Sequence, residues 1–256
     1  LRDELLTLLT DGPTSTSRSS RSVWAGASMK KYWAVEARFD VRDLAAGRVV
    51  AGVYARRHHY DSEDFFGLGP TARRADHGEF SLDETRLGGH AGVRPWPALT
   101  LGAGYDYSRP RVADADDDDD DPDDDDELPI ARRFDDTAAP GLGTDTTFHR
   151  LRLFAELDYR QPKHARKGGW YRVSFSHFHD PRGAFDFTRT DVDLRQYASV
   201  LAERRVFAVR LFASSSEADA GSRVPFYLMP ALGGHDTLRG FRDYRFRGLH
   251  ALALQT

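Results

Sequence analysis

Two short segments have the composition of a metal or acid–base site. The segment 176–180 reads SHFHD, so His177 and His179 lie on one face of a strand, beside Asp180. The segment 58–64 reads HHYDSED and combines two histidines with three carboxylates. Imidazole and carboxylate groups at such spacing can bind zinc. Both segments also lie near predicted strand ends, where polar rims are common, and we favour that interpretation over a metal site.

No catalytic arrangement accompanies these segments. Ser176 and His177 are neighbours, so on a strand their side chains point to opposite faces and cannot form a nucleophile–base pair. The sequence also lacks a Gly-x-Ser-x-Gly motif, a P-loop and a His-Glu-x-x-His motif. We therefore predict that the chain is not an enzyme and binds no cofactor and no metal.

The charge of the chain is unevenly distributed. The net charge is −4, but residues 114–127 hold eleven Asp and one Glu, which leaves +8 elsewhere (36 basic minus 28 acidic residues). A block of like charge repels itself, so we predict a solvated acidic loop within 110–147. A Ca²⁺ site is the alternative, although the run lacks the spacing of a calcium-binding loop. The basic residues interleave with acids on the same strand faces, which favours a mixed-charge wall over a nucleic-acid-binding surface.

Length and composition bound the fold class. A chain of 256 residues can form one large all-β domain or two small ones. No run approaches the ~18 apolar residues of a transmembrane helix. The absence of cysteine excludes disulfides and thiolate metal sites. Residues 1–22 read as a short helix followed by a Ser/Thr-rich linker, and because the chain starts at Leu1 without Met we expect a fragment or a processed form.

Alternation with a period of two dominates the remainder of the chain. In 33–42 the odd positions are apolar and the even positions are mostly charged, and 99–107 and 148–160 repeat the pattern. Such alternation predicts half-buried strands. The nine expected strands are 23–42, 48–65, 79–94, 98–109, 148–160, 170–179, 185–201, 206–216 and 249–256.

The predicted connections alternate between short and long. Every second connection is long (67–78, 110–147 and 217–248), except that the connection at 181–184 is short, and aromatic residues collect at the predicted strand ends. Both features are typical of an outer-membrane barrel, whose strands of about 10 residues end in aromatic girdles. We therefore predict an all-β fold over 23–256, an incomplete up-and-down antiparallel transmembrane β-barrel. A soluble all-β binding domain, which can show the same alternation, is the less favoured alternative.

The last long connection carries a recognisable motif. It contains Leu238, Arg239, Gly240 and Phe241 in succession, preceded by the segment 230–234 (PALGG). With the segment 64–70 (DFFGLGP), these residues resemble the bacterial surface antigen family, the BamA- and TamA-type outer-membrane assembly and translocation barrels. The resemblance covers most of 23–256.

The resemblance implies where this loop should lie. In the family the loop folds back into the barrel lumen, and its arginine pairs with an aspartate on a strand further along the chain. The partner of Arg239 is therefore expected after Thr256. Gly240 would provide a tight turn and Phe241 an apolar anchor. Residues expected to support the loop are Gly233, Gly234, Phe246 and Gly248.

The resemblance also implies strand number and function. Family barrels have sixteen strands with this loop after the eleventh, so about three strands would be missing upstream and four downstream. The implied function is insertion of outer-membrane proteins or translocation of a polypeptide, in the outer membrane of a Gram-negative-type bacterium. Implied partners are outer-membrane lipid, an unfolded outer-membrane or secreted client and periplasmic accessory proteins. Because no POTRA domain is recognisable in 1–22, a barrel that anchors or exports a fused patatin-like or phosphoesterase hydrolase is the alternative.

Overall fold

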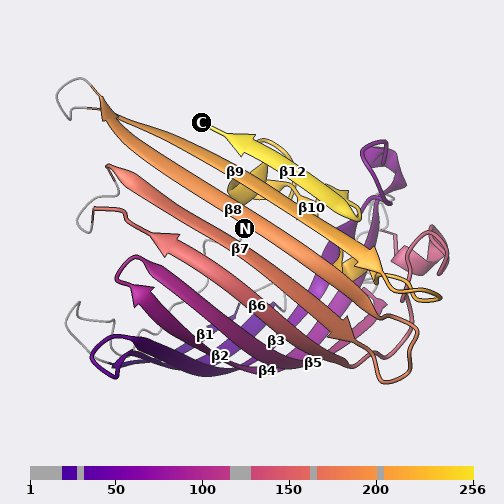
Figure 1. Ribbon diagram of the computed structural model, residues 1–256. Coiled ribbons are helices and arrows are strands. Elements are labelled where there is room, and N and C mark those ends of the chain that lie inside the picture. The colour runs from indigo at the N-terminus through magenta and orange to yellow at the C-terminus, as the bar shows by residue number, and fades with distance from the viewer. Residues whose placement is uncertain (1–18, 28–31, 116–127, 162–165, 201–204) are drawn as a thin grey trace.

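One up-and-down sheet of ten antiparallel strands makes up most of the structure, a computed structural model that describes residues 19–27, 32–115, 128–161, 166–200 and 205–256. The predictions for 1–18 and for the acidic run 116–127 lie outside these residues. Strands that are consecutive in the chain are neighbours in the sheet, except that β9 pairs with β12. The sheet curls into an open trough (Figure 1), and this topology confirms the predicted fold class.

The ten strands are β1 (Ser19–Ala27), β2 (Trp33–Leu44), β3 (Val49–Phe65), β4 (Gly78–Trp96), β5 (Leu99–Asp114), β6 (Phe148–Asp158), β7 (Gly168–His179), β8 (Phe187–Val200), β9 (Arg205–Ala218) and β12 (His250–Gln255). The smaller elements are β10 (Ala231–Leu232), β11 (Phe246–Arg247), α1 (Gly234–Thr237) and the 3₁₀ turns η2 (Arg74–Asp76), η3 (Ile130–Arg132) and η4 (Phe226–Leu228). The long connections follow β3, β5 and β9 and so leave one end of the sheet, here named the loop end. Within the described ranges, no helix is both long and apolar enough to cross a membrane.

The single strand predicted over 23–42 is wrong, because this stretch forms a hairpin. β1 and β2 pair antiparallel, with Trp24 opposite Glu36 and Ala27 opposite Trp33. Residues 28–31 read SMKK and contain no Gly, Pro, Asn or Asp, so the sequence gives no turn signal there. The last long connection therefore follows the ninth strand of the sheet and not the eighth, and β1 begins four residues before the expected boundary at 23.

The two faces of the sheet have opposite chemistry. One face, here named the outward face, exposes large apolar side chains, whereas the inner face carries arginines and carboxylates. This is the reverse of a water-soluble sheet, and an apolar surface of this extent requires an apolar solvent or a partner. The exposed residues include Val35, Val53, Leu87, Leu101, Leu151, Leu153, Val173, Phe175, Phe207, Leu252 and Leu254.

The apolar core lies at the loop end of the inner face. Phenylalanines from the ends of the strands are covered there by residues of the connections 128–147 and 219–249, which together are named the cap. The ring of Phe226 in the cap lies 4.9 Å from the ring of Phe65 and 4.9 Å from that of Phe80. The core is built from Phe65, Phe80, Val112, Ile130, Ala139, Phe148, Phe178, Phe185, Phe187, Val224, Phe226, Tyr227 and Met229.

Replacement of Phe226 tests whether the cap is a packed part of the fold. Phe226 is fully buried, so Phe226→Ala should destabilise the cap by about 3–5 kcal/mol, the cost of a cavity of this size. Urea unfolding in detergent, followed by gel mobility before and after heating, measures the loss. Phe207→Ala removes the same side chain from the outward face, where it is 55% exposed, and should leave the unfolding of the cap unchanged. Equal midpoints for the two variants would contradict a packed cap.

Candidate functional site

A β-bulge in β3 turns a carboxylate toward the inner face. The register with β4 shifts by one residue between Tyr60 and Glu63. Side chains beyond such a shift exchange faces. Glu63 and Phe65, which a regular strand continuing from Val53 would point outward, face inward instead and are buried. The bulge therefore places a carboxylate under the cap.

Arg247 of β11 is the side chain that meets this carboxylate. It is 5% exposed, with Nη2 3.9 Å from Glu63 Oε2, and its Nη1 donates a hydrogen bond to the Phe226 carbonyl oxygen at 3.3 Å. The rings of Phe80, Phe226 and Tyr244 lie 5.6, 6.0 and 4.9 Å from the guanidinium carbon. Burial lowers the pKa of Arg247 and Glu63 opposes this effect, but an arginine stays charged in proteins. A buried cation is thus held by a carboxylate, a carbonyl and aromatic faces.

The segment 64–70 packs against this part of the loop. Leu68 forms a parallel bridge with Arg247, and the Gly69 N–H donates to the Arg247 carbonyl oxygen at 2.6 Å. Gly69 has a φ of +88°, which favours glycine. A Cβ on Gly248 would lie 3.9 Å from Gly69 N, so the two backbones are close. The segment 64–70 is therefore in contact with the loop that carries the motif, at residues 247 and 248, a link that the sequence alone did not reveal.

The predicted motif residues form a turn near the tip of the loop. Leu238 is half-buried, whereas Arg239, Gly240 and Phe241 are exposed. Gly240 makes the turn with a φ of +93°, and the Phe241 N–H donates to the Leu238 carbonyl oxygen at 3.3 Å. Arg239 makes no ion pair with any other residue that the structure describes. A partner after Thr256 stays a prediction.

Three of the residues expected to support the loop lie around this turn. The Gly234 N–H donates to the Phe241 carbonyl oxygen at 3.1 Å, and the rings of Phe241 and Phe246 meet edge to face at 5.4 Å. Gly233 has a φ of +144°, and a Cβ there would lie 2.2 Å from the Arg242 carbonyl oxygen. Only a glycine fits at this position, which closes the turn onto itself.

The tip of the loop reaches the middle of the inner face. The carbonyl oxygen of Asp236 accepts a hydrogen bond from Arg210 Nη1 at 2.7 Å, and that of Thr237 accepts one from Gln255 Nε2 at 2.8 Å. Arg210 and Gln255 are opposite one another in the register of β9 and β12. Arg210 Nη2 also lies 2.9 Å from Asp193 Oδ2. The loop is thus held at its base by Arg247 and at its tip by wall residues.

The inner face also encloses a basic cavity of about 1090 Å³. Nine arginines and four carboxylates contribute to its lining, so its net charge is positive. A concave surface with one sign of charge concentrates oppositely charged ligands. The charged lining residues are Arg38, Arg42, Arg56, Arg86, Arg94, Arg150, Arg152, Arg160, Arg172, Glu36, Asp40, Glu156 and Asp158.

Glycine allows side chains of this wall to pair across an intervening strand. The Tyr54 hydroxyl donates to Asp106 Oδ1, and Arg150 Nε donates to Asp106 Oδ2 at 2.7 Å. Gly88 lies between Tyr54 and Asp106 in the register. A Cβ on Gly88 would lie 2.2 Å from Asp106 Oδ1, so a larger residue would separate the pair. Side-chain contacts therefore link four neighbouring strands of this wall, β3 to β6.

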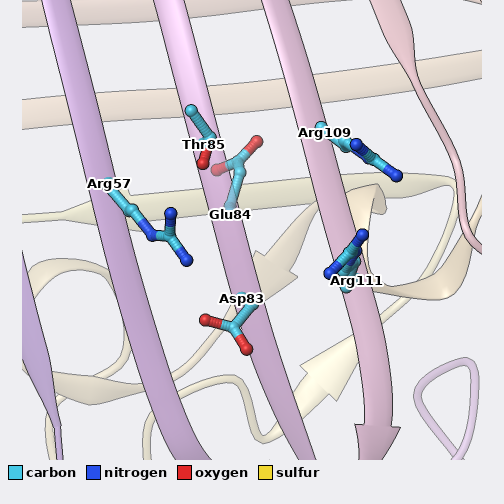
Figure 2. Close-up of a pocket in the computed structure, with 6 residues that line it drawn as sticks. All are labelled: Arg57, Asp83, Glu84, Thr85, Arg109 and Arg111. Atoms are coloured by element: carbon cyan, nitrogen blue, oxygen red, sulfur yellow. The ribbon is translucent and has the colours of Figure 1, made fainter.

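A second basic group lies on the outward face, close to the loop end (Figure 2). It forms a pocket of about 260 Å³ lined by Arg57, Asp83, Glu84, Thr85, Arg109 and Arg111. Arg57, Thr85 and Arg109 are direct neighbours across β3, β4 and β5. Asp83 is engaged by His59 Nδ1 at 3.2 Å, whereas Arg57 and Arg109 make no ion pair with a described residue. Guanidinium groups so arranged can bind a phosphate or a carboxylate.

The histidines of the two segments considered as metal sites have different partners, and His58 and His59 lie on different faces of the sheet. His179 pairs with Asp186 at 3.2 Å. His58 faces inward, 3.7 Å from Glu84, whereas His59 faces outward. Neither segment gathers its own histidines and carboxylates at one point.

The comparisons with known proteins address the fold. No protein-family model and no curated protein matches the chain. Among solved structures, the chain is similar to the crystal structure of BamA from Haemophilus ducreyi lacking POTRA domains 1–3, with a TM-score of 0.61 and 14% sequence identity. The likeness covers 88% of this chain and 40% of that chain. This likeness shows the fold of the chain. The chain spans less than half of the length of that protein.

Removal of Arg247 tests the contact that holds the cap. Arg247→Ala removes the cation that lies beside the buried carboxylate of Glu63, so we expect a loss of about 3–5 kcal/mol in unfolding free energy and earlier proteolysis of the cap. Arg242→Ala is the matched control, because that side chain is 55% exposed and lies 4.0 Å from its nearest carboxylate. Urea titration and limited proteolysis in detergent measure both variants. If the two variants lose stability equally, Arg247 has no special role.

Proposed function

We propose that the chain is part of an outer-membrane barrel of a Gram-negative-type bacterium that inserts outer-membrane proteins or translocates a polypeptide. The cap acts as an internal gate, and no catalytic role is assigned to this chain. The observation that carries the proposal is the connection 219–249, which lies on the inner face and is held there by the buried Arg247–Glu63 contact. The BamA-like fold supports it.

The energetics of the cap suit a gate. Opening would move the Arg247 guanidinium away from Glu63 and expose the phenylalanines beneath it, which costs several kcal/mol. The closed state therefore dominates until a client binds the open state more tightly. A polypeptide with acidic groups would meet the basic cavity behind the cap.

The outward pocket supports lipid as a partner. The row that ends the apolar band contains Ala55, Leu87 and Tyr107, and the next row toward the loop end contains Arg57 and Arg109. Lipid phosphates lie just outside the hydrocarbon region, where basic side chains bind them. The pocket is thus placed where a barrel in a membrane would meet headgroup phosphates.

The family motif gives the first test of the function. In the full-length protein, Arg239→Ala should lower the yield of folded barrel or slow the insertion of a client into liposomes several-fold. Gel mobility before and after heating reports barrel folding, and protease protection of the client reports insertion. Arg242→Ala changes an exposed arginine of the same loop and should behave as wild type. Unchanged folding and unchanged insertion in Arg239→Ala would overturn the role of the motif.

Charge reversal tests the lipid contact. The double variant Arg57→Glu with Arg109→Glu should bind at least tenfold less lipid A, a glycolipid with two phosphates, because repulsion replaces two charge-assisted contacts. Native mass spectrometry of the protein from detergent with added lipid A counts the bound molecules. Arg205→Glu, at the opposite end of the sheet, is the control. Equal lipid A binding by wild type and double variant would contradict the assignment.

A further inference from the structure

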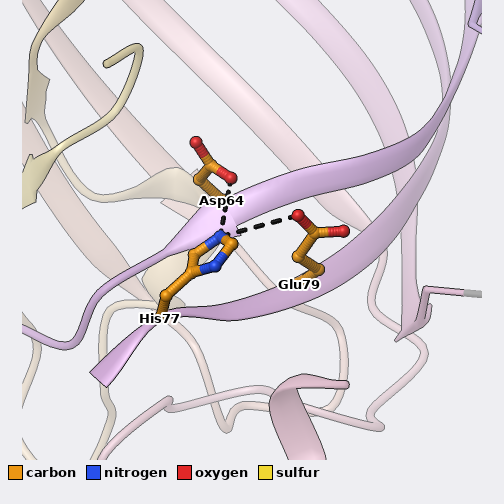
Figure 3. A group of neighbouring side chains, drawn as sticks. All are labelled: Asp64, His77 and Glu79. Carbon is orange, nitrogen blue, oxygen red and sulfur yellow. Dashed lines mark hydrogen bonds and ion pairs between the residues drawn. The ribbon is translucent and has the colours of Figure 1, made fainter. Parts of the chain in front are cut away.

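Three side chains where β3 ends and β4 begins converge on one point (Figure 3). Asp64 is near the end of β3, His77 immediately precedes β4, and Glu79 is the second residue of β4. His77 Nε2 lies 2.8 Å from Asp64 Oδ1 and 3.6 Å from Glu79 Oε1. One ligand atom of each residue lies within 4.8 Å of the other two. Both carboxylates therefore face the same imidazole nitrogen.

The spacing of these atoms suits a tetrahedral metal ion. Nitrogen and oxygen ligands lie about 2.0–2.2 Å from zinc, so two ligands of one tetrahedral ion are about 3.4 Å apart. The distances from His77 Nε2, 2.8 and 3.6 Å, lie on either side of that value. One imidazole and two carboxylates suit Zn²⁺ or another first-row divalent ion, whereas Ca²⁺ and Mg²⁺ prefer oxygen ligands alone.

The imidazole is held in position by its surroundings. His77 is 7% exposed. Its ring stacks on that of Phe66, with the centroids 5.0 Å apart and the planes at 25°. A ring fixed in this way keeps Nε2 directed at the carboxylates, so little conformational entropy is lost when a ligand binds.

One carboxylate is oriented through its second oxygen. The Ser62 hydroxyl donates a hydrogen bond to Glu79 Oε2. The oxygens that face His77 are Asp64 Oδ1 and Glu79 Oε1. Outer contacts of this kind fix the first ligands of metal sites.

A neighbouring histidine, His59, has the same kinds of partner, but its two carboxylates do not face one nitrogen atom. His59 also has two carboxylates beside it, but its Nε2 lies 3.5 Å from Asp61 and its Nδ1 3.2 Å from Asp83. The two nitrogens lie on different sides of the ring, so the two carboxylates cannot share one ion with either nitrogen. The group around His77 differs from that around His59 because both of its carboxylates face the same nitrogen, although the residue types are similar.

We propose that Asp64, His77 and Glu79 bind one divalent transition-metal ion, with Zn²⁺ as the best fit and water as the fourth ligand. The ion would link the end of β3 to the start of β4, the segments that flank the connection 66–77 on which the loop around Arg247 packs. Zinc binding would thus stabilise the surface under the cap. The proposal does not depend on the function proposed above, because it concerns the fold of this connection.

Metal titration of the full-length protein in detergent, after removal of metal with EDTA, tests the site. Co²⁺ should produce the intense visible absorption of a tetrahedral complex, and Zn²⁺ should displace it with a stoichiometry of one. His77→Ala should bind Zn²⁺ at least tenfold more weakly. His59→Ala should bind it as wild type does, because that imidazole does not converge on the site.

Stability gives an independent measurement. Zn²⁺ should raise the unfolding temperature of wild type and of His59→Ala but not that of His77→Ala. If His77→Ala does not fold, Glu79→Gln replaces it, since this change keeps the size of the side chain and removes the charge. Absence of Zn²⁺ binding by folded wild type, or equal binding by wild type and both ligand variants, would overturn the proposal.

Discussion

The arrangement of the cap depends on one buried charge. Arg247 is enclosed by aromatic rings, and its guanidinium lies beside the carboxylate of Glu63. An arginine cannot lose its proton in such a place, so it must be paired or the segment must move. Because Arg247 is also joined through its backbone to Gly69, the guanidinium fixes the loop and the wall connection together. The phenylalanine core packs around this contact, which holds the loop in one position.

Much of the fold could be predicted from the alternation of apolar and polar residues alone, because this period of two is present in the long strands. The hairpin of β1 and β2 could not, since alternation continues on both sides of 28–31 and no turn residue interrupts it. Periodicity reports which face a side chain takes and not where the chain reverses. The prediction of strand number failed for this reason.

The candidate site was harder to predict, and the reasons are physical. The motif drew attention to Arg239, which is exposed, whereas Arg247, eight residues later, is buried. Its partner is about 180 residues away in the chain and faces inward only because of the bulge before Glu63. Bulges are set by cross-strand pairing and leave no mark in a stretch such as HHYDSED. The Tyr54–Asp106 pair, which forms across Gly88, could not be predicted from the sequence either, because a whole strand lies between the two residues.

The bulge in β3 has a consequence for how this region can change. It sends Glu63 inward to the cap and, at the next position, Asp64 outward to His77. A single inserted or deleted residue there would reverse both directions at once, since neighbouring side chains on a strand take opposite faces. Substitutions can alter one partner at a time, but changes of length cannot. Over many generations this stretch should therefore tolerate altered residue types far better than altered spacing.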